Sequence, residues 1–576
     1  MGVGRTWRTA ALGVAGVLAL SACMGLPTSG PVQQGDVVLS ELDAAIPIPT
    51  GPRDDDTPEE IVNGFLAAAS SGVYDDYETA REFLMSTAFR EWRPRSATTI
   101  YDTQDPEVHI ADDEKGGVTV ALDPIATVDA AGRYTEAAAG APVELELRLD
   151  RDANGEWRIA DLPDGVLMSW TNFVSSHRQV EVYFATRDAQ LLVPEVRWFQ
   201  STRMVEQAVR ALVGGPSPWL RDAVRTGVPA GSTLPQTGVT IDDAGGLTLD
   251  LESTIVGTPD ELEDPEELRN LFQAQLEATL AGATAVEGDI SVRFNGWPWE
   301  PTERLTPRID PAPDSGPFVL ADGEEEGETV LAEVEDGTVV PLADVASLEG
   351  IVASRPAISL DGEIRVLLDA GRRLVLLPAE AAAPEVLLEG TALLPPSVDR
   401  DGWIWTAEHV TAGELTAVSP TGDVVVVPAA WLAGREVRSV RVSRDGARIA
   451  VAYQSAEGPS VIEVAAVQRD TRGRPQALGR ERIVVGAALN DVREVSWYDE
   501  VTLAVLGSVP NADGPTAYLV PLGGASSARA PQAGAVDIAA SPDRIYLLGA
   551  DGVLRWNQAS TWTAVVEGVR DPAFPG

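Results

Sequence analysis

Cysteine, lysine and histidine are almost absent from this sequence of 576 residues. Cys23 is the single cysteine, Lys115 is the single lysine among 43 basic residues, and there are three histidines. One cysteine excludes any disulfide bond within the chain, so each domain must be held together by its own hydrophobic core. Hydrophobic residues make up 44% of the chain, which is enough for such cores. The use of arginine in place of lysine indicates GC-rich coding, as in high-GC bacteria.

The sequence also lacks the usual patterns of catalytic and metal sites. His109, His177 and His409 fall in three different predicted domains, and no histidine or cysteine cluster has the spacing of zinc ligands. No nucleophile elbow, phosphate-binding loop or dinucleotide fingerprint is present. We therefore predict no catalytic residue, no cofactor and no metal site. A pair of catalytic carboxylates stays open, because such a pair is defined in space and the chain has 88 acidic residues.

Positive charge is scarce, and the formal net charge is −45 at pH 7. Binding to nucleic acid depends on Lys and Arg side chains that displace counterions from phosphates. This composition excludes nucleic acid as a partner. It also argues against a body that lies flat on an anionic membrane.

No hydrophobic run is long enough to span a membrane as a helix. The longest one near the N-terminus, Ala10 to Leu20, is shorter than the roughly 20 residues that a bilayer requires. Arg5 and Arg8 precede it and Leu20-Ser21-Ala22-Cys23 follows it, which is the layout of a signal peptide over residues 1–22. The alternative is an ordinary secretory signal with an incidental cysteine.

Leu20-Ser21-Ala22-Cys23 resembles the lipobox of bacterial lipoproteins. The resemblance implies cleavage between Ala22 and Cys23. It also implies a Cys23 that carries S-diacylglycerol and N-palmitoyl groups. The protein would then be anchored by lipid at the extracytoplasmic face of the cell membrane.

The segment 23–56 is rich in Gly and Pro, has no helical or strand period, and is predicted to be an extended tether. A domain over 57–172 follows, and Thr57-Pro58-Glu59-Glu60 predicts a capping box at its first helix. We expect a second helix over about 76–92. Alternating strands are then predicted at 107–110, 118–122, 143–150 and 157–161. Two helices and a curved antiparallel sheet make an α+β domain that resembles the NTF2-like cone, either as a ligand site or as a packed spacer.

A second α+β unit is predicted over 178–299. It starts with Val180-Glu181-Val182-Tyr183-Phe184, has a helix ending in Ala211-Leu212-Val213-Gly214-Gly215-Pro216, and finishes with Val292-Arg293-Phe294-Asn295-Gly296. This order resembles the GerMN domain, which implies a small module of envelope and spore-coat assemblies without catalytic residues. The adjoining segment 300–317 holds five prolines and is predicted to be a stiff linker. We expect Trp297 and Trp299 to pack this unit against the next one.

The remainder, 318–576, consists of short strands divided by Asp-Gly turns. The aspartates 361, 401, 445, 499 and 543 recur at intervals of 40–54 residues, which predicts a β-propeller with five or six blades rather than a β-sandwich. Ser443-Arg444-Asp445-Gly446 resembles the repeat of TolB-type propellers. Four tryptophans are expected to pack between blades: Trp403, Trp405, Trp497 and Trp556.

A lipobox, an α+β domain, a GerMN domain and a propeller in this order resemble the LpqB family of actinobacterial lipoproteins. The resemblance implies a non-catalytic accessory protein that associates with the extracellular part of the MtrB sensor kinase and affects cell-envelope homeostasis. The alternatives are a cell-envelope carbohydrate-binding or hydrolytic protein that uses the propeller face, and a structural spacer. All three share a multidomain fold class with two α+β domains followed by an all-β propeller.

Overall fold

The fold was analysed in a computed structural model of the chain. It describes residues 50–102, 106–110, 117–138, 140, 142–254, 256–378, 383–456, 458–558 and 561–576. The predicted signal peptide 1–22, the cleavage site at Ala22 and Cys23, and the tether as far as residue 49 lie outside the described residues. Within the described part, no helix has the length and hydropathy that a membrane crossing demands.

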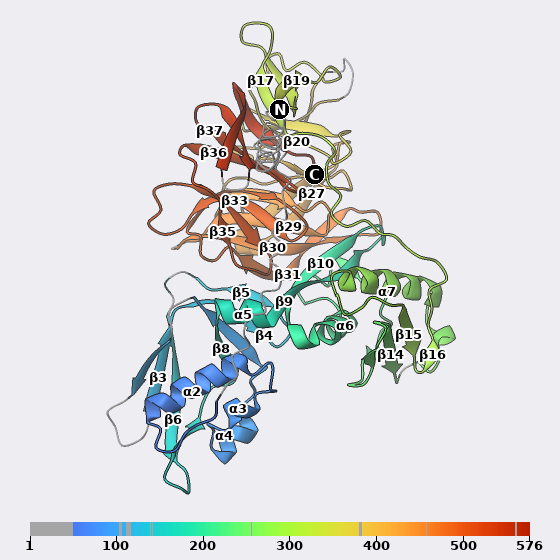
Figure 1. The fold of residues 1–576 in the computed structure, drawn as a ribbon. Helices are drawn as coiled ribbons and strands as arrows, with labels where there is room; N and C mark the ends of the chain where they lie inside the picture. Colours follow the sequence, from blue (N-terminus) through green and yellow to red (C-terminus); the bar gives the residue numbers. More distant parts are fainter. Residues whose placement is uncertain are drawn as a thin grey trace, which may run out of the picture. The chain divides into compact units, whose positions relative to one another are not determined.

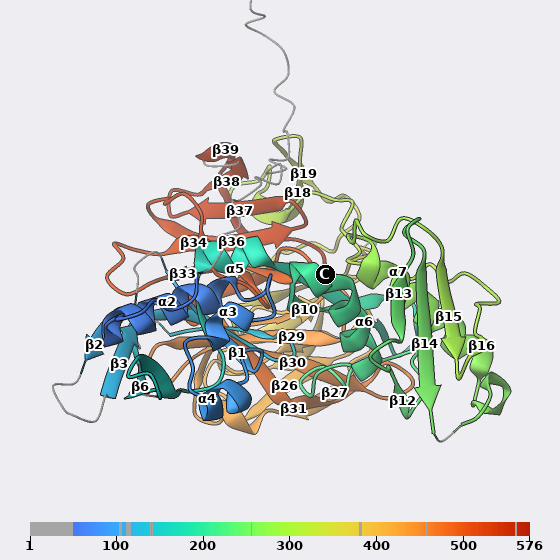
Figure 2. The same ribbon diagram turned by 60° about the horizontal axis from the view of Figure 1, so that its bottom comes forward.

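The N-terminal domain opens on helix α2 (Pro58–Ser71), which begins as the sequence predicts. Thr57 caps it, because its hydroxyl accepts the Glu60 N–H at 3.3 Å while the Glu60 carboxylate accepts the Thr57 N–H at 2.8 Å. Ile61 and Phe65 lie on the buried face of the helix. The helix packs against strands β7 (Trp157–Asp161) and β8 (Val166–Ser169). Figure 2 shows α2 alongside the blue strands of this domain.

The prediction of one helix over 76–92 is wrong. The segment forms two short helices, α3 (Glu78–Arg81) and α4 (Ser86–Glu91). Between them the backbone pairs with β7, since Ile159 donates to the Phe83 carbonyl at 2.9 Å and the Met85 N–H donates to the Ile159 carbonyl at 2.8 Å. This long-range pairing uses backbone groups that a continuous helix would need, and it therefore interrupts the helix.

Eight strands of this domain form two sheets of four rather than one curved sheet. The predicted strands are confirmed and make the sheet β2-β3-β6-β7, with β2 at Glu107–Ile110, β3 at Gly117–Leu122 and β6 at Val143–Arg151. The other sheet, β5-β4-β1-β8, has strands that the sequence analysis missed: β1 (Ala97–Tyr101), β4 (Pro124–Asp129), β5 (Tyr134–Glu136) and β8. Strands β1 and β8 are parallel, because the rest of the domain separates them along the chain.

The middle domain follows α5 (Trp170–Ser176) and carries a sheet of three strands in the order β10-β9-β11. Its strands are β9 (His177–Thr186), β10 (Leu192–Gln200) and β11 (Val224–Arg225). Helices α6 (Met204–Gly214) and α7 (Pro265–Leu280) pack on β9 (Figure 1). Helix α6 ends where Gly215 takes a φ of 82°, a backbone conformation that favours glycine.

A second sheet of this domain is built on β14 (Leu247–Ser253) and β15 (Ile290–Phe294), which are parallel. The remaining short elements of the domain are β12 (Ser232–Thr233), β13 (Val239–Ile241), β16 (Trp297–Pro298), and the 3-10 turns η1 (Ser201–Arg203) and η2 (Pro259–Glu261).

The expected role of the two tryptophans at the end of this sheet is wrong. Trp299 is buried in the middle domain itself, with ring centroids 5.6 Å from Phe272 and 5.9 Å from Phe294. Trp297 is 58% exposed. Residues two apart in a strand share a face, but β16 ends at Pro298 and Trp299 lies beyond it. There the Trp299 N–H donates to the Val292 carbonyl of β15 at 2.9 Å, and the ring enters the core.

Six sheets of four strands make the C-terminal domain a six-bladed propeller, within the range of five or six blades that the repeat predicts. Three strands of the first blade are β17 (Phe318–Asp322), β18 (Thr329–Glu335) and β19 (Thr338–Pro341), and its fourth is β40 (Val569–Ala573) from the end of the chain. The second blade has β20 (Ala353–Ile358), β21 (Arg365–Asp369), β22 (Arg373–Leu376) and β23 (Glu385–Glu389), and the third has β24 (Ser397–Val398), β25 (Ile404–Thr406), β26 (Glu414–Val418) and β27 (Val424–Pro428). The fourth has β28 (Glu436–Val442), β29 (Arg448–Gln454), β30 (Ser460–Arg469) and β31 (Pro475–Val485), and the fifth has β32 (Asp491–Trp497), β33 (Thr502–Ser508), β34 (Thr516–Pro521) and β35 (Ser527–Ala528). The sixth has β36 (Ala535–Ser541), β37 (Arg544–Gly549), β38 (Val553–Gln558) and β39 (Thr561–Glu567). A 3-10 turn, η3 (Ala430–Leu432), connects two of the blades.

The innermost strands of the six blades form a closed ring around the axis of the propeller. They contact one another in the order β40, β20, β24, β28, β32, β36 and again β40. The five repeated aspartates lie in the turns that follow β20, β24, β28, β32 and β36. In the Asp361-Gly362 turn, for example, Gly362 has a φ of 75° and the Ser359 hydroxyl donates to Asp361 at 2.5 Å. The turn chemistry that revealed the repeat in the sequence therefore also closes the inner hairpin of the blade.

Two of the four tryptophans join neighbouring blades as expected. The Trp497 indole N–H donates to the Arg441 carbonyl on the preceding blade at 3.1 Å. Trp405 is fully buried, and the guanidinium of Arg469 from the next blade lies 5.9 Å from its ring centroid.

Candidate functional site

The three histidines do not assemble into a site. His177 is buried against Phe173, with 4.7 Å between ring centroids, and burial lowers the pKa of its imidazole to about 4. His409 lies 3.0 Å from Glu436 in the propeller, and His109 lies 3.4 Å from Glu107 in the N-terminal domain. Across the described part of the chain, no group of three or more metal-ligating side chains comes together.

The N-terminal domain contains a small apolar void of about 70 Å³, lined by Phe65, Leu145, Leu147 and neighbouring residues. Pockets that hold small molecules are typically about 300–1,000 Å³. The void is therefore too small for a ligand of that size in this conformation.

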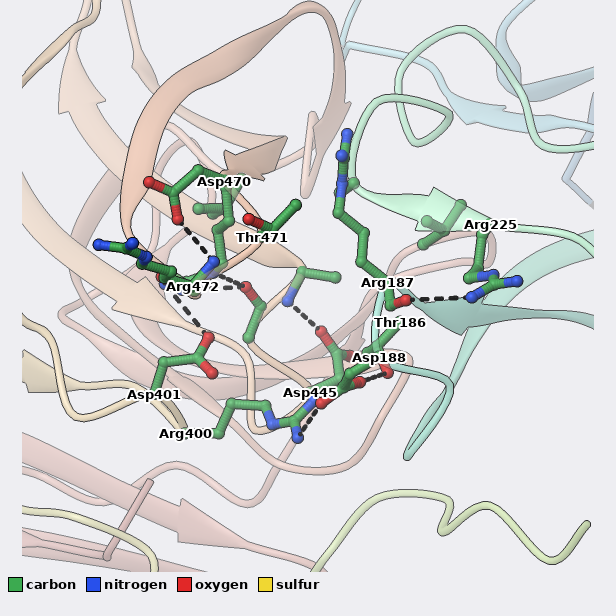
Figure 3. A pocket seen from close by; sticks show the side chains of 17 residues that line it. Thr186, Arg187, Asp188, Arg225, Arg400, Asp401, Asp445, Asp470, Thr471 and Arg472 are labelled. Carbon is green, nitrogen blue, oxygen red and sulfur yellow. Dashed lines mark hydrogen bonds and ion pairs between the residues drawn. The ribbon is translucent and has the colours of Figure 1, made fainter.

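A hollow of about 740 Å³ lies between the middle domain and the propeller. We call it the interdomain pocket; Figure 3 shows its lining. The middle domain contributes the turn after β9 and the residues around β11, and the propeller contributes the inner turns of two blades and the β30–β31 hairpin. Arginine and aspartate dominate the lining: Arg187, Asp188, Arg225, Arg400, Asp401, Asp445, Arg469, Asp470 and Arg472.

Ion pairs hold one wall of this pocket across the domain boundary. Arg400 of the propeller donates to both carboxylate oxygens of Asp188 in the middle domain, at 2.9 and 3.3 Å (Figure 3). Burial tends to raise the pKa of Asp188, but the hydrogen bonds from Arg400 and Thr186 outweigh it and the pKa is lowered. Asp188 is therefore a stable anion whose role is to hold the two domains together.

The opposite wall is held within the propeller. Arg469 donates to Asp399 at 2.6 Å and lies 3.4 Å from Asp401. Burial raises the pKa of Asp401, and Arg469 offsets only part of that rise. Arg448 pairs with Asp445, which also accepts the Ala447 N–H at 2.7 Å.

Two guanidinium groups of the pocket have spare donors. Arg187 donates to the Asp222 carbonyl at 2.8 Å, and the exposed Arg472 side chain has no partner among the described residues. No aromatic side chain belongs to the described lining. The pocket is therefore equipped to bind polar groups of either charge by hydrogen bonds, and it offers no ring surface for stacking a sugar.

A second charged cluster lies on the axis of the propeller. Five of the six innermost strands each place one charged residue there: Arg355, Arg441, Glu494, Asp537 and Asp571. Arg355 contacts Asp537 at 2.6 Å, Glu494 at 3.3 Å and Asp571 at 3.3 Å, and Arg441 contacts Glu494 at 2.8 Å. We call these five residues the axial cluster.

Glu494 and Asp537 are buried side by side in the axial cluster, and their pKa values are shifted in opposite directions. Burial and the neighbouring Glu494 raise the pKa of Asp537 well above its ordinary value. Burial also acts to raise the pKa of Glu494, but hydrogen bonding from Asp537 and the charges of Arg355 and Arg441 lower it overall. Within this pair a proton is therefore favoured on Asp537 and the negative charge on Glu494.

Further contacts join the three domains of the described chain. The Trp198 indole of the middle domain donates to the Gly523 carbonyl at 2.7 Å, and Gln468 donates to Asp222 at 2.9 Å. Glu136 of the N-terminal domain accepts hydrogen bonds from the backbone and hydroxyl of Ser526, at 3.1 and 3.0 Å. These bonds link each α+β domain directly to the propeller.

The predicted site residues Ala22 and Cys23 lie outside the described part of the chain, and none of the residues of the interdomain pocket or the axial cluster was singled out as functional in the sequence. The axial cluster did have a sequence signal. In four of the five repeats, a charged residue on the innermost strand precedes the repeated aspartate by four to six positions: Arg355, Arg441, Glu494 and Asp537.

Comparison with known proteins matches these three domains in the same order. Family models match for the N-terminal domain of lipoprotein LpqB over residues 51–174, for the sporulation and spore germination domain named Germane over 181–298, and for the β-propeller domain of lipoprotein LpqB over 329–575. The lipoprotein LpqB of Streptomyces coelicolor is 28% identical, over 99% of this chain and 98% of its own length. That of Thermobifida fusca is 27% identical, over 97% of each chain. Among solved structures, TolB from Acinetobacter baumannii matches 45% of this chain and 65% of its own, with 15% identity and a TM-score of 0.34.

An α+β N-terminal domain, a GerMN domain and a six-bladed propeller define the class of this chain as a multidomain, mostly β protein. The matches to family models and to relatives over nearly their full length agree on the family. The chain belongs to the LpqB family of lipoproteins, whose matched relatives are actinobacterial.

Proposed function

We propose that this protein is a lipid-anchored accessory protein at the extracytoplasmic face of the cell membrane, and that it binds a two-component sensor kinase of the MtrB type and modulates it without catalysing a reaction. Residues 1–22 would be removed as the signal peptide, and the acylated Cys23 would hold the remaining chain at the bilayer. The domains are then 57–172, 178–299 and 318–576, joined by the tether 23–56 and the linker 300–317.

The observation that carries this proposal is the direct bonding of both α+β domains to the propeller. Contacts such as Arg400 with Asp188 and Trp198 with Gly523 leave little freedom between the domains. A binding protein that keeps its surfaces in fixed register loses little conformational entropy when it meets a partner. Such preorganisation is what an accessory subunit needs, because it has to act on the conformation of another protein.

The lipid anchor supplies the rest of the affinity. When two partners are held at one membrane, the second contact is effectively intramolecular, and its effective concentration reaches the millimolar range. A weak contact with the extracellular part of a kinase is then sufficient. The full sequence has a net charge of −45, and removal of residues 1–22 with Arg5 and Arg8 would leave the body more acidic still. The anionic membrane surface would repel this body, which would remain available to that partner.

The test is crosslinking on intact cells, followed by identification of the proteins recovered with this chain. We expect a sensor kinase in the wild-type sample and a much weaker signal with Cys23→Ala, which abolishes the anchor. Ser21→Ala, which retains the cysteine, serves as the matched control. Deletion of the protein should also change the output of the kinase.

Recovery of wall polysaccharide in place of a kinase, or turnover of wall fragments by the purified chain, would favour the competing function of a carbohydrate-binding or hydrolytic protein. An unchanged kinase output together with no recovered kinase would contradict the proposal.

A further inference from the structure

A pocket of about 470 Å³ lies between the N-terminal domain and the middle domain, apart from the interdomain pocket and the axial cluster. Its walls are the β4–β5 turn on one side, and β10, α6 and the segment after α6 on the other. Of the residues that the structure describes, no carboxylate lines it and five arginines do: Arg133, Arg197, Arg203, Arg210 and Arg221. We call it the arginine pocket.

Such a lining is unusual for this chain. The sequence has 88 acidic residues against 43 basic ones, so an average patch of its surface is acidic. Clustered guanidinium groups repel one another, and their cost to stability falls when an anion is bound among them.

The innermost arginine is fixed in place. Arg197 is buried, and it donates to the Ala131 carbonyl at 2.7 Å, to Ser217 at 2.9 Å and to Glu195 at 3.0 Å. Its Nε–H is buried without a partner. The bond to Ala131 crosses from the middle domain to the N-terminal domain, so both domains are needed to form the pocket.

Three more arginines pair with carboxylates of residues that do not belong to the described lining. Arg203 and Arg210 share Glu206, at 3.1 and 2.9 Å, and Arg133 pairs with Asp129 at 2.7 Å.

The fifth arginine, Arg221, is exposed and has no side-chain partner among the described residues. Together with Glu195 beside Arg197, the surroundings supply three carboxylates for five guanidinium groups. The pocket therefore carries an excess of about two positive charges.

We propose that the arginine pocket binds a phosphoryl group carried by a small molecule or a lipid headgroup. A guanidinium presents paired N–H donors whose spacing matches the oxygens of a phosphate. A phosphomonoester carries about −1.5 to −2 charges near neutral pH, which neutralises the excess in the pocket. A single carboxylate would neutralise only part of it. This inference does not depend on the proposed kinase association.

The test uses the full chain purified in detergent and inorganic phosphate as the probe. At constant ionic strength, maintained with chloride, we expect phosphate to raise the thermal unfolding midpoint and to bind measurably by calorimetry. Arg221→Ala should weaken binding by about tenfold, the loss expected when one charge-assisted hydrogen bond is removed. Arg293→Ala is the matched control and should bind phosphate like the wild type, because Arg293 is also an exposed residue of the middle domain and has no side-chain partner in the described part of the chain.

Two further probes distinguish the source of the phosphoryl group. They are glycerol 3-phosphate, and vesicles of a lipid without net charge to which a few per cent phosphatidic acid is added. Binding of the soluble ester alone assigns a small-molecule ligand, and Arg221-dependent binding of the vesicles assigns a headgroup. No binding of any of the three phosphate probes, or binding that is equal in Arg221→Ala and Arg293→Ala, would overturn the proposal.

Discussion

Arg444 and Asp310 form a two-pronged ion pair that fixes the proline-rich linker to the propeller. The distances are 2.8 Å from Nε and 3.1 Å from Nη2, and the guanidinium also donates to the carbonyls of Trp497 and Tyr498 at 3.1 Å each. The same linker pairs with the middle domain, where the Leu192 N–H donates to the Arg308 carbonyl at 2.9 Å. The linker is thus attached along its length to both of the domains that it connects.

We expect Arg444→Met to destabilise the chain by about 3–5 kcal/mol, because Asp310 would remain as a largely buried charge without its partner. Denaturant unfolding of the full chain measures the loss, and limited proteolysis should show new cleavage within the linker. Arg304→Met is the control, since Arg304 forms only a mostly exposed pair with Glu277. Equal protease resistance of Arg444→Met and wild type would contradict the role given to this pair.

Two isosteric changes in the axial cluster should have very different costs. Asp537→Asn keeps a neutral side chain that accepts from Arg355 and donates to Glu494, so we expect a change in stability within about 1 kcal/mol. Glu494→Gln removes the anion between Arg355 and Arg441 and should cost about 3–5 kcal/mol. Chemical denaturation of the two variants side by side measures the contrast. The reverse order would show that the proton resides on Glu494.

The contact between Tyr183 and Glu500 makes stability dependent on pH. Tyr183 of the middle domain donates to the Glu500 carboxylate of the propeller at 2.8 Å. Burial, chiefly, and the negative charges of Asp310 and Glu181 raise the pKa of Glu500 to about 7 from its ordinary 4.5, although Tyr183 and Arg448 act in the opposite direction.

Because the folded state holds this proton more tightly than the unfolded state, the stabilisation from Glu500 is complete below pH 4.5 and is lost as the pH rises through about 7. In Glu500→Gln the amide oxygen still accepts from Tyr183, but the side chain no longer titrates. We therefore expect the thermal unfolding midpoint of this variant to depend less on pH between 4.5 and about 7. The exposed Glu481→Gln is the control and should follow the wild-type profile. A wild-type-like slope in Glu500→Gln would count against the assignment.

Trp299 and Trp297 should differ sharply in their effect on stability. Trp299→Ala leaves a cavity beside Phe272 and Phe294 and should cost about 3–5 kcal/mol. Trp297→Ala removes an exposed ring and should stay within about 0.5 kcal/mol of wild type. Thermal unfolding of the two variants provides the comparison, and a large effect of Trp297→Ala would restore the idea that this ring packs against another domain.

Local chemistry explains what could be predicted from the sequence. The Thr57 capping box and the Asp361-Gly362 turn involve residues a few positions apart, and both are confirmed. The blade repeat is marked by the same kind of turn. It predicts a propeller of five or six blades, and the structure has six.

Features that depend on residues far apart in the chain could not be predicted in this way. The break between α3 and α4 comes from Ile159, and the arginine pocket joins Arg133 to Arg221 across two domains. Trp297 and Trp299 are the same residue type two positions apart, and a regular strand would place both on one face. Strand β16 ends at Pro298, so Trp299 enters the core while Trp297 stays exposed, and the sequence pattern does not show where the strand ends.

The place of β40 in the first blade has a consequence for how the propeller is made. That blade takes its innermost strand from the last residues of the chain, next to strands that are among the first of the domain. Synthesis of the domain must therefore be finished before its first blade is complete, and until then β17 has an open edge. An unfinished or clipped chain would present that edge to other proteins, which makes an intact C-terminus a requirement for a propeller that does not aggregate.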